Sequence, residues 1–169
     1  DGINGSDSGH ARIYTYNGTV WSQLGGDIEG EAVNNYSGWL SLNADGRTVA
    51  IGAYGNGNYS GHVRIYQYNS SKTIAQPDQS LANFGPIGWN RMGSDIDGEA
   101  VDDQSGYSVS LSANGRTVAI GSKTNDGNGN QSGHVRIYLY NGTAWSQLGL
   151  DIDGEAVEDF SGQSVSLSA

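Results

Sequence analysis

Apolar and polar residues alternate along several short stretches of this chain. In residues 134–140, Val135, Ile137 and Leu139 would lie on one face of a strand and the intervening residues on the other. Residues 107–113 alternate in the same way. This period of two predicts β-strands with one aliphatic face. Because a single small sheet cannot bury such a face, we expect several sheets to pack on one another.

The alternating stretches belong to a repeat of about fifty residues, and each copy opens on Ser-Gly-His. The triplets are Ser8 to His10, Ser60 to His62 and Ser132 to His134. The repeats are therefore residues 1–59, 60–131 and 132–169. The second copy predicts strands at 61–68, 89–100, 107–113 and 116–122, with a surface loop inserted at 70–88. The third copy lacks its fourth strand.

These strands predict an all-β fold of tandem four-stranded antiparallel blades that is β-propeller-like and incomplete or open, with about 2.75 repeats. A closed propeller needs at least about four blades. Four dipeptides between strands predict tight type I′ turns, in which both central residues have positive φ. They are Asn17-Gly18, Asp45-Gly46, Asn114-Gly115 and Asn141-Gly142.

Composition and charge exclude several classes of function. The chain has 169 residues, 27 glycines and a formal net charge of −10, and its eight lysines and arginines are scattered. Binding to nucleic acid is therefore not expected, since phosphate contacts need clustered cations. No apolar run approaches the roughly 18 residues of a membrane span. Cysteine is absent, so disulfides and thiolate metal sites are excluded.

Catalytic motifs are missing too, and an enzyme is not expected. The three histidines are all copies of the one in Ser-Gly-His, and the sequence has no Gly-x-Ser-x-Gly elbow, P-loop or His-Glu-x-x-His. Paired carboxylates recur in every repeat, as structural elements do, whereas a catalytic pair is normally unique.

Carboxylates cluster in one repeated segment, which holds thirteen of the eighteen. Two interpretations stay open. The carboxylates could pair with the repeated Arg12, Arg64 and Arg136. Alternatively, their density of hard oxygen ligands suits Ca²⁺. The candidate metal ligands are Asp95, Asp97, Glu99, Asp151, Asp153 and Glu155.

Three of the four tryptophans occupy one position of the repeat, at Trp21, Trp89 and Trp145. A residue present in every copy suggests packing in the core. The alternative is a row of platforms on which sugar rings stack. Trp39 departs from the repeat and is a further candidate for sugar stacking.

Asn-x-Ser/Thr triplets are frequent and mark candidate glycosylation sites. They lie at Asn4, Asn17, Asn35, Asn58, Asn69, Asn130 and Asn141. We expect Asn17, Asn69 and Asn141, at hairpin tips, to be the most accessible.

Residues 105–122, with a glycine near the start and a Gly-Ser ending, resemble the FG-GAP repeat of integrin-α-type β-propellers. The whole chain is similar to the Ser-Gly-His-Val-Arg-Ile-Tyr repeats found in tandem in large secreted or surface proteins of microbes. The resemblance implies a four-stranded blade, an extracellular location and adhesive or scaffolding work. The calcium loop of integrin-type repeats lies between the third and fourth strands, where this chain has only a tight turn, so that site is not carried over.

The sequence thus predicts a non-catalytic extracellular or cell-surface structural or adhesive repeat protein. Unpaired strands at its open ends would recruit further copies of the chain, giving a polymer or filament that is glycosylated. The alternative function is that of a glycan-binding propeller lectin, which could depend on Ca²⁺.

Overall fold

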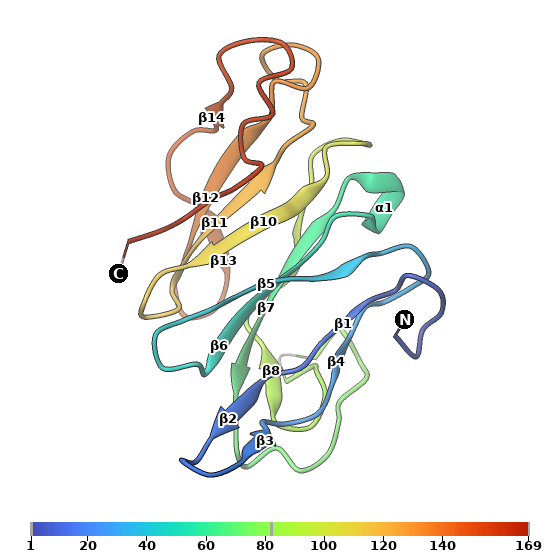
Figure 1. Ribbon diagram of the computed structural model, residues 1–169, viewed down its shortest axis with the longest axis vertical. Helices are drawn as coiled ribbons and strands as arrows, with labels where there is room; N and C mark the ends of the chain where they lie inside the picture. Colours follow the sequence, from blue (N-terminus) through green and yellow to red (C-terminus); the bar gives the residue numbers. More distant parts are fainter. Residues whose placement is uncertain (1, 82, 169) are drawn as a thin grey trace.

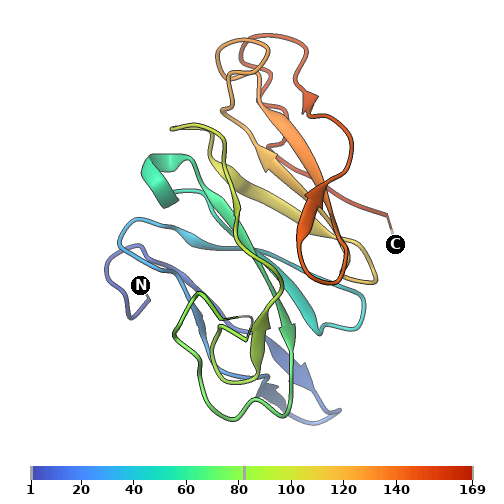
Figure 2. The ribbon, with the colours of Figure 1, turned by 180° about the vertical axis from the view of Figure 1, so that it is seen from behind.

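The computed structural model describes residues 2–81 and 83–168, which form antiparallel sheets with one short helix, α1 (Asn56–Tyr59) (Figure 1). The predicted all-β fold of tandem four-stranded sheets is confirmed. The sheets follow one another along the long axis of the molecule, and the two views show no closed ring in the described part of the chain (Figure 2). The arrangement is that of an open, incomplete propeller.

Two large sheets have the same topology. In the first, the order is β5 (Ser37–Leu42), β6 (Thr48–Ala53), β7 (His62–Tyr68) and β8 (Trp89–Arg91), with β9 (Ile96–Asp97) also paired to β7. In the second, the order is β10 (Ser105–Leu111), β11 (Thr117–Ser122), β12 (His134–Tyr140) and β13 (Trp145–Gln147), with β14 (Ile152–Asp153) also paired to β12. Register is preserved between them: Tyr68 faces Trp89 and Tyr140 faces Trp145.

The N-terminal segment forms half of a third sheet. Its strands are β1 (His10–Ala11), β2 (Tyr14–Tyr16), β3 (Trp21–Gln23) and β4 (Ile28–Glu29). β1 pairs with β4 and β2 pairs with β3, as β7 pairs with β9 and β8. This half-sheet therefore corresponds to the second half of each large sheet.

The sheets are out of phase with the sequence repeats. Each large sheet takes its first two strands from the end of one repeat and its remaining strands from the start of the next. Consecutive repeats are thus joined by backbone hydrogen bonds along a shared sheet, from β6 to β7 and from β11 to β12.

Aliphatic faces are buried between consecutive sheets, as the sequence predicts. One core cluster, including Val63, Ile65 and Val118, joins the two large sheets. The other, including Ile13, Ile51 and Trp89, joins the half-sheet to the first large sheet. β6 is buried along its whole length because it contributes to both clusters, with Ala50 in one and Val49 in the other.

Two strand predictions from the sequence are wrong. The second strand, expected at 89–100, is split into β8 and β9, because Gly93 has φ of 73° and the register on β7 shifts there. The expected third strand of the last repeat does not form among the described residues of 161–168, since this chain offers it no β11-like neighbour.

The turns also differ from the type I′ prediction. Of each Asn-Gly or Asp-Gly pair, only the glycine has positive φ, for example 97° at Gly18. The Oδ1 atom of Asn17 accepts hydrogen bonds from the backbone N–H groups of Thr19 and Val20, both at 2.9 Å. This side-chain bridge stabilises a wider loop in place of the two-residue turn.

Candidate functional site

The contact between consecutive sheets is termed a junction, and the described residues contain two. The first joins the half-sheet (β1–β4) to the β5–β9 sheet, and the second joins the β5–β9 sheet to the β10–β14 sheet. Because the repeats are equivalent, a contact that recurs at both junctions defines how one repeat binds the next.

Ser-Gly-His is part of this packing. Gly9, Gly61 and Gly133 have φ of 69–76°, and an added Cβ would clash with the backbone carbonyl of Ser37, Ser105 or Ser161, respectively. A Cβ added to Gly61, for example, would lie 2.1 Å from the backbone oxygen of Ser105. The motif thus allows two backbones to touch, which explains its recurrence in every copy.

A tryptophan crosses each junction. The indole Nε1 of Trp89 donates a hydrogen bond to the backbone carbonyl of Leu24 at 3.1 Å, and that of Trp145 donates to Met92 at 2.7 Å. Each acceptor stands three residues after the tryptophan of the preceding repeat. Trp89 is 0% exposed, so its role in the core is clear.

An arginine crosses each junction in the same way. Arg64 binds Glu31 of the preceding repeat, and Arg136 Nη1 lies 3.2 Å from Glu99 Oε1. The pairing of the repeated arginines with the acidic segment is therefore confirmed.

Arg64 also pairs with Asp95 of its own repeat, with Nη2 2.7 Å from Oδ2, and only 6% of its side chain is exposed. Burial acts to raise the pKa of Asp95, but the hydrogen bonds and charge of Arg64 outweigh it, so the pKa lies below its ordinary value. The guanidinium groups of Arg64 and Arg91 also lie over the ring of Phe84, which belongs to the inserted loop.

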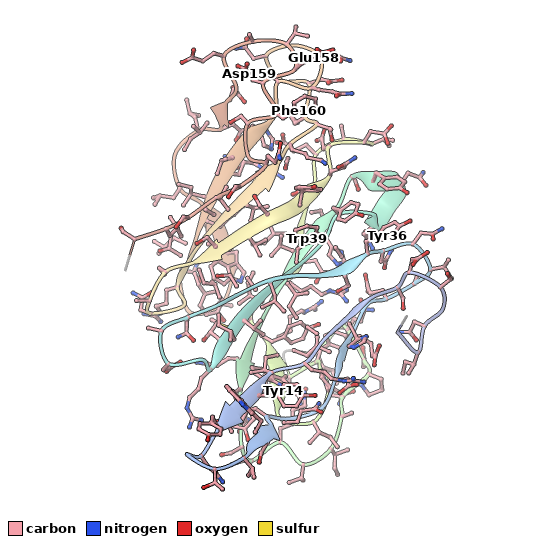
Figure 3. All side chains as sticks on the ribbon, in the orientation of Figure 1. Tyr14, Tyr36, Trp39, Glu158, Asp159 and Phe160 are labelled. Atoms are coloured by element: carbon pink, nitrogen blue, oxygen red, sulfur yellow. The ribbon has the colours of Figure 1, made fainter. Side chains whose placement is uncertain are left out.

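Both halves of this contact are left uncovered at the two ends of the molecule. At the N-terminal end, Trp21 is 69% exposed, and among the described residues Arg12 pairs with Asp27 of its own repeat alone. At the other end, Leu148, which corresponds to Leu24 and Met92, is exposed, and so is Glu155, which corresponds to Glu31 and Glu99. Figure 3 shows Tyr14 near one end of the molecule and Glu158, Asp159 and Phe160 near the other.

Three of the six carboxylates predicted as metal ligands lie in groups at the two junctions. Asp95 lies with Glu31 and His62 at the first junction, and Glu99 and Asp151 lie with His134 at the second. Within each trio the possible ligand atoms are all within 4.8 Å of one another. Asp97 and Glu155 are in neither group, and Asp153 lies beside the second.

The participation of histidine was missed from the sequence, because it comes from the start of β7 or β12, far along the chain from the acidic segment. Burial, followed by the charge of the neighbouring arginine, lowers the pKa of both His62 and His134.

Trp39 lies in an aromatic group on the surface, where it stacks on Tyr107 with ring centroids 5.0 Å apart. Trp39, Tyr36 and Tyr54 line an open cleft of about 450 Å³ (Figure 3). Trp39 is 46% exposed, whereas Trp145 is partly buried. Among the four tryptophans, Trp21 and Trp39 thus present accessible rings.

The candidate glycosylation sites differ in accessibility. Asn17 and Asn141 are exposed at the tips between β2 and β3 and between β12 and β13, and Asn69 is half-buried after β7. Asn4, Asn58 and Asn130 are exposed as well. Asn35 is buried and accepts a hydrogen bond from the Ala32 N–H.

Comparisons with known proteins add no assignment. No protein-family model matches the chain, and no curated protein matches it. In the described residues, no helix is long and apolar enough to cross a membrane. The two junctions and the aromatic cleft are therefore the features from which a function is inferred.

Proposed function

We propose that this chain is a non-catalytic, extracellular structural or adhesive repeat module that binds further copies of itself head to tail. The observation that carries the proposal is the recurrence of one set of contacts at both junctions, together with the exposure of its two halves at opposite ends. In such an assembly the next copy repeats a contact that the chain already makes twice.

Apolar surface supports this docking. Tyr14, Tyr16 and Trp21 are exposed at the N-terminal end, although their counterparts in later repeats are buried or partly buried. Leu148 and Ile152 are exposed at the other end. In the proposed contact, Trp21 donates its indole N–H to the Leu148 carbonyl of a second copy, as Trp89 does to Leu24.

The strand edge at the N-terminal end is open as well. β1 and β2 have no neighbour in the described structure on the edge where β7 pairs with β6 and β12 with β11. Free edges of this kind bind further strands. Because the two binding surfaces are different and lie at opposite ends, a contact that does not close produces a filament rather than a symmetric dimer.

Charge exchange across the proposed contact provides the test. By analogy with Arg64 and Glu31, Arg12 of one copy should bind Glu155 of the next. We expect Arg12→Glu to weaken self-association at least about tenfold, through loss of the pair and repulsion, and Arg12→Glu with Glu155→Arg to restore it. Sedimentation velocity over a range of concentrations measures the association of each variant.

Glu158→Arg, on an exposed residue of the same segment, is the control, and we expect it to leave Arg12→Glu unrescued. A wild-type chain that stays monomeric at every concentration, or a charge exchange that restores nothing, would contradict the head-to-tail contact.

We further propose that the module works outside the cell as a glycoprotein. Asn17 and Asn141 are favoured as attachment sites by their exposure at loop tips, and Asn35 is disfavoured by burial. Intact mass of the native protein tests this proposal, because a mass equal to that of the bare polypeptide would exclude it.

The second candidate function is glycan binding, and the cleft beside Trp39 favours it. Aromatic faces stack on the apolar face of a pyranose, and Tyr36 and Tyr54 offer hydroxyl groups next to the ring. Ca²⁺ dependence would involve the acidic segment. A glycan array with wild-type chain, Trp39→Ala and added chelator separates this candidate from the structural one.

A further inference from the structure

The second junction contains a mixed group of nitrogen and oxygen ligands. Glu99 follows β9, His134 begins β12 and Asp151 precedes β14, and the possible ligand atoms of these three side chains lie within 4.8 Å of one another. The carboxylate of Asp153 is also close, with Oδ1 4.0 Å from His134 Nδ1. The group joins the two large sheets.

His134 is buried, with 1% of its side chain exposed. Among the described residues neither ring nitrogen has a hydrogen-bond partner, and Nε2 is fully shielded from solvent. Nδ1 is directed at the group, 3.7 Å from Asp151 Oδ2. This distance is too long for a hydrogen bond, but two ligands that share a tetrahedral ion, each about 2.0–2.2 Å from it, are separated by about 3.3–3.6 Å.

The first junction provides an internal comparison. There, Glu31 and Asp95 are neutralised by two guanidinium groups, Arg64 and Arg91. At the second junction, Arg136 contacts Glu99 and is the one guanidinium group that pairs with Glu99 or Asp151 in the described part of the chain.

This difference in charge between the junctions comes from one position of the repeat. Arg91 is replaced by Gln147 in the last repeat, and the uncharged amide of Gln147 donates a hydrogen bond from Nε2 to Asp151 Oδ1 at 2.5 Å. Among the described residues, Asp151 consequently has no lysine or arginine within ion-pairing distance. The second group therefore keeps an excess of negative charge that the first does not have.

We propose that Glu99, His134 and Asp151, with Asp153, bind a divalent first-row transition-metal ion such as Zn²⁺. An imidazole nitrogen among carboxylates selects ions of this class, whereas Ca²⁺ is held by oxygen ligands alone. The ion would bind Nδ1 of the buried imidazole and connect the two large sheets. This inference is independent of self-assembly, because every ligand belongs to one chain.

Titration with Zn²⁺ tests the site. We expect isothermal titration calorimetry to show one equivalent bound per chain and the melting temperature to rise with Zn²⁺. Ca²⁺ at the same concentration should do neither. Asp151→Asn and the exposed Glu99→Gln should each weaken binding about tenfold or more. Asp27→Asn, the equivalent change in the first repeat, should leave it unchanged.

Gln147→Arg gives the sharpest variant because it removes no ligand. It places beside Asp151 the cation that Arg91 supplies beside Asp95, and we expect it to abolish Zn²⁺ binding while the chain stays folded. Absence of Zn²⁺ binding to the wild-type chain, or binding that survives Gln147→Arg and Asp151→Asn, would overturn the proposal.

Discussion

Replacing Trp89 by alanine should lower the free energy of unfolding by about 3–5 kcal/mol, the usual cost of removing a large buried aromatic side chain. The indole is completely buried at the first junction, where it also packs against Tyr68 and donates to the Leu24 carbonyl. Urea unfolding followed by circular dichroism measures the change.

Trp21→Ala is the matched control, since it alters the equivalent position of the first repeat, where the ring is largely exposed. Measured at a concentration at which the chain is monomeric, it should change stability far less. Equal losses in the two variants would show that the tryptophan stabilises each hairpin rather than the junction.

Arg64→Met should lower the free energy of unfolding by about 3–5 kcal/mol, because it leaves Glu31 without its guanidinium partner and Asp95 with Arg91 alone. Arg12→Met at the equivalent exposed position is the control and should have little effect, since Arg12 is 46% exposed and binds a single carboxylate. Urea unfolding of both variants gives the comparison.

The pair of Arg64 and Asp95 also predicts how the stability of the folded chain changes at acidic pH. The pKa of Asp95 is lowered in the folded chain, so its contribution to stability is present above the unfolded value of 3.8 and is lost as pH falls below it. In Arg64→Met this contribution should be smaller, because Arg91 still pairs with Asp95 but the hydrogen bonds and charge of Arg64 are lost. An unchanged slope of stability against pH below 4 would show that Arg64 does not control Asp95.

Much of the architecture follows from the sequence, because alternation and repetition have direct physical consequences. Val63 and Ile65 leave water together, and they pack against side chains of the next sheet, such as Val118. The pairing of Arg64 with carboxylates is predictable for the same reason, as both partners recur with the repeat.

Other features of the structure cannot be predicted from the types of residue in the sequence. The acceptor of the Trp89 indole is a backbone carbonyl, which every residue has, so Leu24 cannot be identified from the sequence. Whether a sheet combines strands of two repeats depends on whether β7 pairs with β6 or only with strands of its own repeat. The alternation of apolar and polar residues is the same in both cases, so it does not distinguish them. His134 joins Asp151 only because β14 pairs with β12, which sequence distance does not reveal.

The absence of cysteine allows a direct measurement of the head-to-tail contact. At the second junction, Ser94 and Thr143 line one hollow, and the corresponding positions across the proposed contact are Leu150 of one copy and Thr19 of the next. A chain with Thr19→Cys and Leu150→Cys, treated with a short bismaleimide, should give a ladder of covalent multimers, whereas each single variant should give dimers at most. Only monomers in the double variant, at concentrations where the wild-type chain associates, would contradict repetition of the internal junction between copies.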